Sequence, residues 1–445
     1  MTCEHPSLSF ELSTHAEVVG YRILTAQQRA AASVSATHRN NKVASTNGDT
    51  SASTFPAPLV LPNDALSIDP RCPPQSLRSW LHLEDRNEVT TRRNKIYVAA
   101  PPHTDSSVQF MQSWSHPQKG SKVENITTPC VEDVIDYLAA FYHGLPVKLL
   151  PPPNLCFVSW DTPTPKRSKS KSLKSTIPPY IGLNTPTECV RIRTRPSPDG
   201  VFAAQLNLDD LLDASISMLP RDAYAFLLIV DHDLFEDEND IFVCGRAYGG
   251  SRVAVVSTAR YHPNLDHREK VEREHAWPAS HCESYIHACC ATADQSSTRP
   301  KKKAKSDAGR IKSHSPQLIS SPGEPMFGAL SAHTVLPAPD LSSALSGLWL
   351  GRICRTASHE LGHCFGMEHC VYYACVMQGS SSLAEDARQP PYLCPIDLAK
   401  ILYASRSTAE TRYRALLSFC KQHSDVHLFA AFAAWICARL AHDYP

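Results

Sequence analysis

The sequence predicts an α/β fold in which a mixed, twisted sheet packs against helices. Apolar runs of strand length alternate with segments whose apolar residues recur at helical spacing. Residues 224–230 (Tyr-Ala-Phe-Leu-Leu-Ile-Val) are apolar throughout, as expected for a central strand buried on both faces. A long helical pattern covers residues 341–365, and further helical patterns follow it. Strands that alternate with helices in this way favour a layered α/β architecture.

The individual elements follow from short apolar runs and from helical spacing. Strands are expected at residues 95–100, 147–150, 189–193, 224–230, 241–245 and 253–257. A helix is expected at residues 131–142, which end before Gly144, and another after Asn207, which is a good N-cap residue. C-terminal helices are expected at residues 396–404, 409–420 and 426–440.

Composition divides the chain into four parts. Residues 1–55 are rich in Ser, Thr, Ala and Asn, and we expect a flexible N-terminal tail. Residues 56–262 hold the predicted sheet and the first helices. Residues 263–335 break the pattern, and the charged, serine-rich stretch 296–325 predicts an insertion that is largely disordered. Residues 336–445 hold the long helix and the C-terminal helices.

Charge and cysteine content limit the possible functions. The 445-residue chain has 44 lysines and arginines and 44 aspartates and glutamates, so no net field draws it to nucleic acid or to a membrane. No run of about 18 apolar residues occurs, and residues 1–5 do not begin a signal peptide. We therefore expect an intracellular, cytoplasmic protein whose 16 cysteines are reduced and, where clustered, bind metal. The run 300–305 (Pro-Lys-Lys-Lys-Ala-Lys) resembles a nuclear localisation signal, although a solvated loop explains it at least equally well.

The strongest chemical signal is an eleven-residue motif at residues 359–369 (HELGHCFGMEH). His359 and His363 lie four positions apart on one helix face, so both rings can reach one metal ion. Gly366 can end the helix and turn the chain, which would bring His369 back as a third ligand. Glu360 stands beside the metal, where its carboxylate can hold a water molecule. Three protein ligands and an open fourth position are typical of catalytic zinc, and the glycine and third histidine weigh against a chance HExxH on a solvated helix.

A second group follows the third histidine at once. Cys370, Cys375 and Cys394 have spacings that suit a second, structural zinc site, with Met377 between them and Asp397 after them. The pattern HExxHxxGxxH, then CxxxxCxM and later CPxx, resembles the archaemetzincins, a family of metzincin-clan zinc metallopeptidases. The likeness is specific at residues 359–397 and looser elsewhere in the chain.

That resemblance implies a role for each of these residues. The three histidines bind the catalytic zinc on a long active-site helix of a metzincin-like α+β fold, Glu360 is the general base, and Met377 forms a Met-turn beneath the metal. Ordinary core packing is the alternative for Met377. Four cysteines bind a second zinc in the family, whereas Asp397 stands at the fourth position here. A Cys₃Asp site with lower affinity, a site completed by another group or by water, and loss of the second zinc all remain open.

The predicted function is therefore that of a zinc metallopeptidase that hydrolyses peptide bonds by metal-activated water, with an aminopeptidase as one form. The alternative is a catalytically weak, zinc-bearing interaction protein. The expected partner is a peptide or protein substrate, which pairs with an edge strand near residues 252–257; we expect a monomer without membrane or nucleic-acid partners. Tyr261 and His262 lie near the region of a transition-state donor, but neither is assigned that role.

Overall fold

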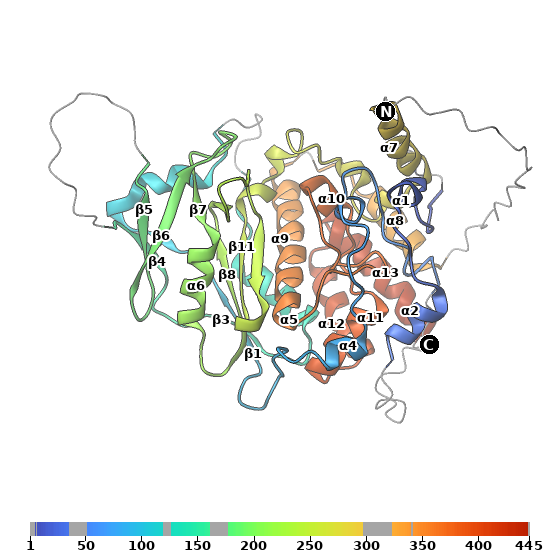
Figure 1. Cartoon of the computed structure of the whole chain (residues 1–445), viewed down its shortest axis with the longest axis horizontal. Helices are drawn as coiled ribbons and strands as arrows, with labels where there is room; N and C mark the ends of the chain where they lie inside the picture. Colours follow the sequence, from blue (N-terminus) through green and yellow to red (C-terminus); the bar gives the residue numbers. More distant parts are fainter. Residues whose placement is uncertain are drawn as a thin grey trace, which may run out of the picture.

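The computed structural model describes residues 5, 7–34, 51–118, 126–160, 177–296, 323–339 and 341–443. Within these ranges the chain forms a five-stranded and a six-stranded sheet together with many helices (Figure 1). The predicted α/β fold with a mixed sheet and a long helix is confirmed. The basic run 300–305 lies outside the described residues.

The five-stranded sheet contains the predicted central strand. Its order is β10 (Gly245–Tyr248), β11 (Val253–Ser257), β8 (Ala223–Val230), β1 (Lys95–Ala99) and β3 (Val147–Leu149). All neighbouring strands run parallel except β10, which is antiparallel to β11. Every residue of β8 is buried, because other layers cover both faces of this sheet.

The position of the sheet edge differs from the prediction. β11 lies between β10 and β8, so its backbone already pairs on both sides and cannot accept a further strand. The edge strand on this side of the sheet is β10, which the turn η4 (Gly249–Ser251) and Arg252, at φ 64°, fold into a tight hairpin with β11. The apolar run predicted as a strand at 241–245 joins this ladder only at Gly245.

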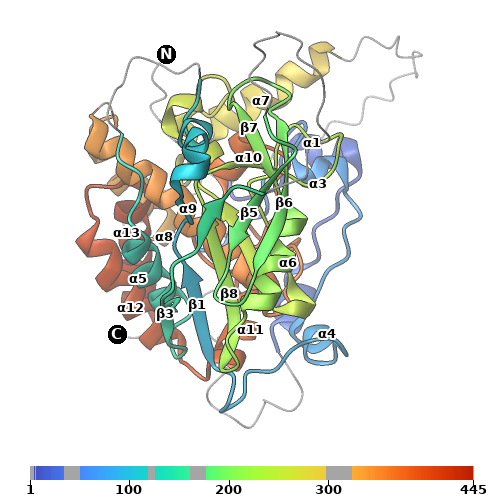
Figure 2. The same ribbon diagram turned by 90° about the vertical axis from the view of Figure 1, so that its left-hand side faces the viewer.

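The six-stranded sheet lies on one side of the molecule and faces the viewer in Figure 2. Its order is β2 (His103–Thr104), β4 (Cys156–Val158), β5 (Tyr180–Asn184), β6 (Cys189–Pro196), β7 (Ala204–Asn207) and β9 (Asp233–Phe235). The sequence predicts only β6, since most of the others are too short for a recognisable pattern. Phe226 and Leu228 of β8 share an apolar layer with Leu183, Leu206 and the helix α6 (Leu208–Met218).

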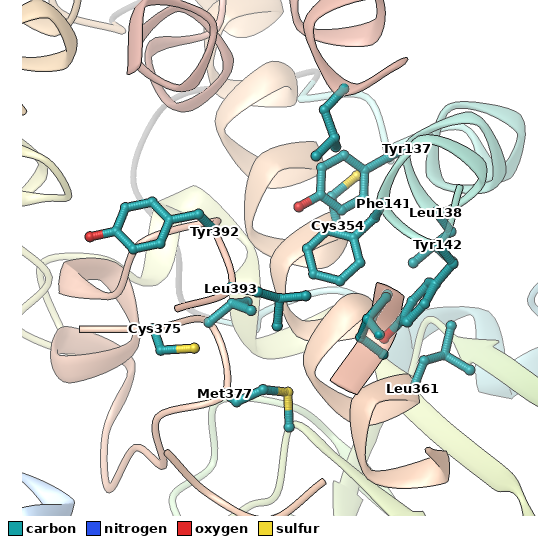
Figure 3. Packing of buried hydrophobic residues seen from close by; sticks show 14 of the residues in the cluster. Tyr137, Leu138, Phe141, Tyr142, Cys354, Leu361, Cys375, Met377, Tyr392 and Leu393 are labelled. Atoms are coloured by element: carbon teal, nitrogen blue, oxygen red, sulfur yellow. The ribbon is translucent and has the colours of Figure 1, made fainter. Parts of the chain in front are cut away.

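Helices cover the opposite face of the five-stranded sheet. The helices α5 (Val131–Phe141) and α9 (Ser342–Cys364) pack directly on it, and beyond them lie α10 (Leu383–Arg388), α11 (Pro395–Ser405), α12 (Ala409–Gln422) and α13 (His427–Asp443). Leu227 and Ile229 of β8 belong to the hydrophobic core between the sheet and these helices, because alternate residues of a strand face the same side. The Tyr142 hydroxyl donates a 2.6 Å hydrogen bond to the Ser358 carbonyl, which fixes α9 against the end of α5 directly before the first histidine of the motif. Figure 3 shows Leu138 and Tyr142 to one side of α9 and Cys375 and Met377 to the other.

The N-terminal region is more ordered than the sequence predicts. Its helices are α1 (Thr14–Val19), α2 (Ala26–Ala32), α3 (Ala65–Ile68) and α4 (Leu77–Leu81). Phe10 is buried in the main core, and the Tyr21 hydroxyl donates a 2.6 Å hydrogen bond to the Val371 carbonyl. The expectation of a flexible tail is therefore wrong for residues 7–34, because a few apolar side chains anchor this segment to a distant part of the chain.

The described part of the predicted insertion is also folded. It contains α7 (Glu283–Ser296), α8 (Pro325–Val335) and the short 3-10 helices η6 (Pro263–Leu265), η7 (Arg273–His275) and η8 (Ala279–His281). Other 3-10 helices are η3 (Ser106–Ser115) and η5 (Ala259–Tyr261). Trp277 is fully buried against Tyr392 and Phe432. This side chain attaches the segment to the core, although the segment is polar in composition. None of the helices in the described ranges is long and apolar enough to cross a membrane.

Candidate active site and metal centre

The structure brings the three histidines of the motif together. His359 and His363 project from the last turns of α9, and Gly366, at φ +76°, reverses the chain so that His369 returns to them. The Nε2 atoms of His359 and His363 are 3.1 Å apart, and the ring centres of the three pairs are 4.8, 5.3 and 5.0 Å apart. Two nitrogen ligands on a tetrahedral zinc ion are separated by about 3.3 Å, so the spacing fits this metal. That the histidines bind zinc stays a prediction.

Backbone carbonyls hold two of these rings in place. Nδ1 of His359 donates to the Val376 carbonyl and Nδ1 of His363 donates to the Met367 carbonyl, both at 2.7 Å. Each bond fixes the tautomer, so the free lone pair is on Nε2 and faces the shared centre. Burial, aided by the neighbouring histidine His369, lowers the pKa of His363 to about 4, and burial likewise holds the pKa of His359 well below its usual value. Neutral imidazoles are the form that binds metal.

Met377 packs directly beneath the histidine helix. Its side chain is fully buried, and a Cβ atom at Gly362, between the two helical histidines, would overlap Met377 Sδ. Gly379 is similarly close, because a Cβ there would lie 3.0 Å from Nδ1 of His369. Both glycines are thus required by close approach, a role that the sequence pattern does not reveal for either of them.

Glu360 faces a cavity next to the histidines. The cavity has a volume of about 560 Å³ and is lined by residues 239–245, by residues 380–383, and by Glu360, His359, His369 and Tyr261 among others. Burial raises the pKa of Glu360 to about 8, and the charge of Arg246 offsets this only in part. A cation at the histidine centre would favour the carboxylate form again. A Cβ atom at Gly245 would lie 3.3 Å from Glu360 Cγ, so the start of the edge strand β10 lies against this glutamate.

The structure places Tyr261 and His262, which the sequence left without a role, in different surroundings. Tyr261 lines the cavity, and its hydroxyl accepts a 2.7 Å hydrogen bond from Thr356 of α9. His262 instead packs against Trp349, with ring centres 4.7 Å apart, and its Nδ1 accepts from the Asn264 amide. Tyr261 is therefore a wall of the cavity, whereas His262 supports the base of α9.

The second predicted group also forms a cluster. Cys370, Cys375, Cys394 and Asp397 are buried, and their candidate ligand atoms lie within 4.8 Å of one another. The Sγ atoms of Cys370 and Cys394 are 3.6 Å apart, and Oδ2 of Asp397 accepts from Cys375 at 3.3 Å and from Cys394 at 3.5 Å. One oxygen of the aspartate thus points among the sulfurs. Three thiols and a carboxylate are a chemically acceptable zinc ligand set, and ligation itself stays a prediction.

A lysine that the sequence does not single out completes this group. Lys400 is 1% exposed and lies one helical turn after Asp397 on α11. Its Nζ donates to Asp397 Oδ1 at 2.8 Å and to Gln75 Oε1 at 2.8 Å. The i,i+3 spacing of an acid and a base is a weak signal for such a pair, because most pairs of this kind lie on solvated faces.

Two histidines at the end of a helix, a third from the turn that follows, a buried glutamate beside them and a cavity in front define a candidate metallopeptidase. Residues 339–401 match the model of Peptidase family M54. Human archaemetzincin-2 is 43% identical over 86 residues, which are 19% of this chain and 23% of that protein. Human archaemetzincin-1 is 25% identical over 232 residues, 52% of this chain and 36% of that protein. The active-site segment is thus similar to the archaemetzincins, and the resemblance predicted from the sequence is confirmed.

These matches span much less than two thirds of the length of the curated relatives. Among solved structures, the archaemetzincin of Methanopyrus kandleri is 17% identical, with a TM-score of 0.32 over 71% of this chain and 98% of that one.

Proposed function

We propose that this protein is a zinc-dependent peptidase with Glu360 as its general base. The observation that carries the proposal is the convergence of the three histidines beside a buried glutamate on the wall of one cavity. Family membership of the same segment supports it. A zinc ion held by His359, His363 and His369 would polarise the peptide carbonyl and activate water for attack.

Residues of this chain would transfer the proton, orient the histidines and bind the peptide. Glu360 takes a proton from the attacking water and returns it to the amine that leaves, which a carboxylate in a partly dehydrated cavity can do. The hydrogen bonds to the Val376 and Met367 carbonyls keep the two helical imidazoles oriented during this exchange. A peptide would pair with the outer edge of β10, whose first residue, Gly245, adjoins Glu360.

The cavity favours short peptides, and we propose aminopeptidase activity as the form to test first. A volume of about 560 Å³ is typical of a small-ligand site. Asp240 and Asp386 line it together with Glu360, and their charge is opposite to that of a peptide α-amino group. Asp386 is itself paired with Arg355 at 2.6 Å, whereas the Asp240 carboxylate accepts hydrogen bonds from the backbone amides of Glu236 and Asp237.

We further propose that a second zinc occupies the cluster of Cys370, Cys375, Cys394 and Asp397 as a structural ion. Burial of all four groups and the direction of Asp397 Oδ2 support this ligand set. The protein would act inside the cell, in the cytoplasm or the nucleus, and as a monomer on peptide or protein substrates. No cysteine of the described ranges forms a disulfide bond, which suits a reducing compartment.

The competing proposal is a zinc-bearing interaction protein with little catalysis. Purified protein should be assayed on a panel of fluorogenic peptides with free and with blocked N-termini, with zinc content measured in parallel. The peptidase proposal predicts hydrolysis that a chelator abolishes and added zinc restores. Zinc-loaded protein that hydrolyses none of the peptides would favour the interaction protein, and faster cleavage of blocked peptides would contradict the aminopeptidase form.

A further inference from the structure

We propose that Gln75 and Lys400 form a polar bridge that couples the two metal sites, so that zinc at the cysteine cluster strengthens zinc binding by the histidines. The inference rests on the proposed occupancy of both sites. It concerns residues that lie far apart in the sequence and that hold no metal themselves.

One end of the bridge is on the turn that delivers the third histidine. Gln75 precedes α4 and is 7% exposed. Its Nε2 donates to the Gly366 carbonyl at 2.9 Å, and its Oε1 accepts from the Glu368 amide at 3.2 Å. The side chain therefore binds both a carbonyl and an amide of the turn at residues 366–368, immediately before His369. A buried amide that satisfies both backbone groups holds such a turn in one conformation.

The other end is in the cysteine cluster. Oε1 of Gln75 also accepts from Nζ of Lys400 at 2.8 Å, and the same Nζ donates to Oδ1 of Asp397 at 2.8 Å. The second carboxylate oxygen, Oδ2, points at the sulfurs of Cys375 and Cys394. A continuous chain of contacts thus runs from the cluster through Asp397, Lys400 and Gln75 to the turn before His369.

The charges along this series of contacts explain how zinc at the cysteine cluster would affect the histidine site. Zinc bound by three thiolates and a carboxylate carries excess negative charge, and Lys400 is a buried cation one contact away from it. Metal binding would fix Asp397 and hold Lys400 more firmly at the cluster. Lys400 in turn holds Gln75 across the turn, so His369 is already in position when the histidines bind zinc. Because coupling free energies are reciprocal, zinc at the histidines would also tighten the cysteine site.

A second route between the sites exists and must be separated from this one. His369 and Cys370 are adjacent in the chain, so each site can affect the other through the backbone. The bridge therefore predicts that part of the coupling, and not all of it, depends on Gln75. A double-mutant cycle measures that part directly.

The experiment measures the zinc affinity of the histidine site by competition with a chromophoric chelator in full-length protein. The relevant binding step is the one that His359→Ala removes. Wild type and Gln75→Leu are each compared with and without Cys394→Ser, which removes a ligand of the second site. In wild type, loss of the second site should weaken the histidine site by about tenfold or more, the usual effect of lost supporting contacts. In Gln75→Leu, loss of the second site should weaken zinc binding by the histidines by a factor at least about threefold smaller than in wild type. A difference of this size is larger than the error of additivity for independent sites.

Two further variants keep the test decisive. Lys400→Met retains every candidate ligand and should weaken the histidine site by about tenfold, as removal of a supporting contact does elsewhere. Tyr21→Phe removes the 2.6 Å hydrogen bond to Val371, next to the same loop but off the bridge, and should leave the coupling factor unchanged. An equal coupling factor in wild type and Gln75→Leu, an unchanged histidine site in Lys400→Met, or wild-type protein that binds fewer than two zinc ions would each overturn the proposal. Two coupled zinc ions without any peptide hydrolysis would instead sink the proposed function and leave the bridge standing.

Discussion

The carbonyl of Val376 accepts a 2.7 Å hydrogen bond from Nδ1 of His359, so the loop that carries Cys375 and Met377 also orients the first histidine of the active-site helix. Val376 is in turn held by a 2.8 Å bond from its amide to the Tyr392 carbonyl, just before Cys394. The cysteine cluster and the histidine centre therefore share one loop. Changes beneath the helix should affect metal binding at both places.

Gly362→Ala should lower both stability and zinc content. The new Cβ would overlap Met377 Sδ inside a packed core, and overpacking of this kind costs about 1–3 kcal/mol. Thermal unfolding and metal analysis check the result. Gly351→Ala is a control in the same helix, because the closest contact of its Cβ would be Cδ2 of Leu428 at 3.1 Å, the end of a flexible side chain. That variant should keep wild-type zinc, and equal behaviour of the two variants would contradict the packing described for Met377.

Stability should fall on mild acidification, in part through His232. Burial lowers the pKa of His232 in the folded protein to about 4, against 6.5 in the unfolded chain. Between these values the unfolded state binds more protons, so stability is fully present above pH 6.5 and declines as the pH falls toward 4. The decline from this residue amounts to about 3 kcal/mol.

The measurement for His232 is urea unfolding at several pH values between 7.5 and 4.5. His232→Gln can keep a donor for the Met111 carbonyl, which Nε2 of His232 contacts at 3.3 Å, but cannot titrate. Its stability should therefore fall less steeply with pH than that of wild type. Parallel curves for the two proteins would show that His232 does not contribute.

Asp397→Ala should reduce the zinc content from two ions to one and lower the melting temperature. The change removes a candidate ligand and leaves the buried Lys400 without its carboxylate partner, and loss of one partner of a buried ion pair costs about 3–5 kcal/mol. Asp397→Cys should retain two metal ions, and its cobalt form should show stronger thiolate-to-metal absorption than wild type. An Asp397→Ala protein with full metal content and an unchanged melting temperature would show that Asp397 is no ligand.

The sequence predicts the parts of this site that depend on local spacing. His359, Glu360 and His363 fall on one helix, and Gly366 signals the turn, so no tertiary information is needed to bring them near one another. The central strand β8 is equally visible, since burial on both faces leaves an unbroken apolar run.

Residues that act across long separations were not predictable in the same way. Gln75 and Lys400 are 325 positions apart, and neither has a neighbouring pattern that announces a contact. The Val376 and Met367 carbonyls have no side-chain signature at all. The choice of β10 over β11 as the edge strand depends on which strands pair, which the alternation of apolar residues does not encode.

The central claim is that Glu360 moves the proton during peptide hydrolysis, and Glu360→Gln tests it most directly. The variant and wild type should be compared for kcat/KM on the best peptide of the panel, with zinc content measured on the same samples. Glu368→Gln, the same change at an exposed glutamate of the same motif, is the control and should keep wild-type activity. We predict that Glu360→Gln retains full zinc and loses activity by about 10²–10⁴-fold. Zinc-loaded Glu360→Gln with the same activity as wild type would contradict the account.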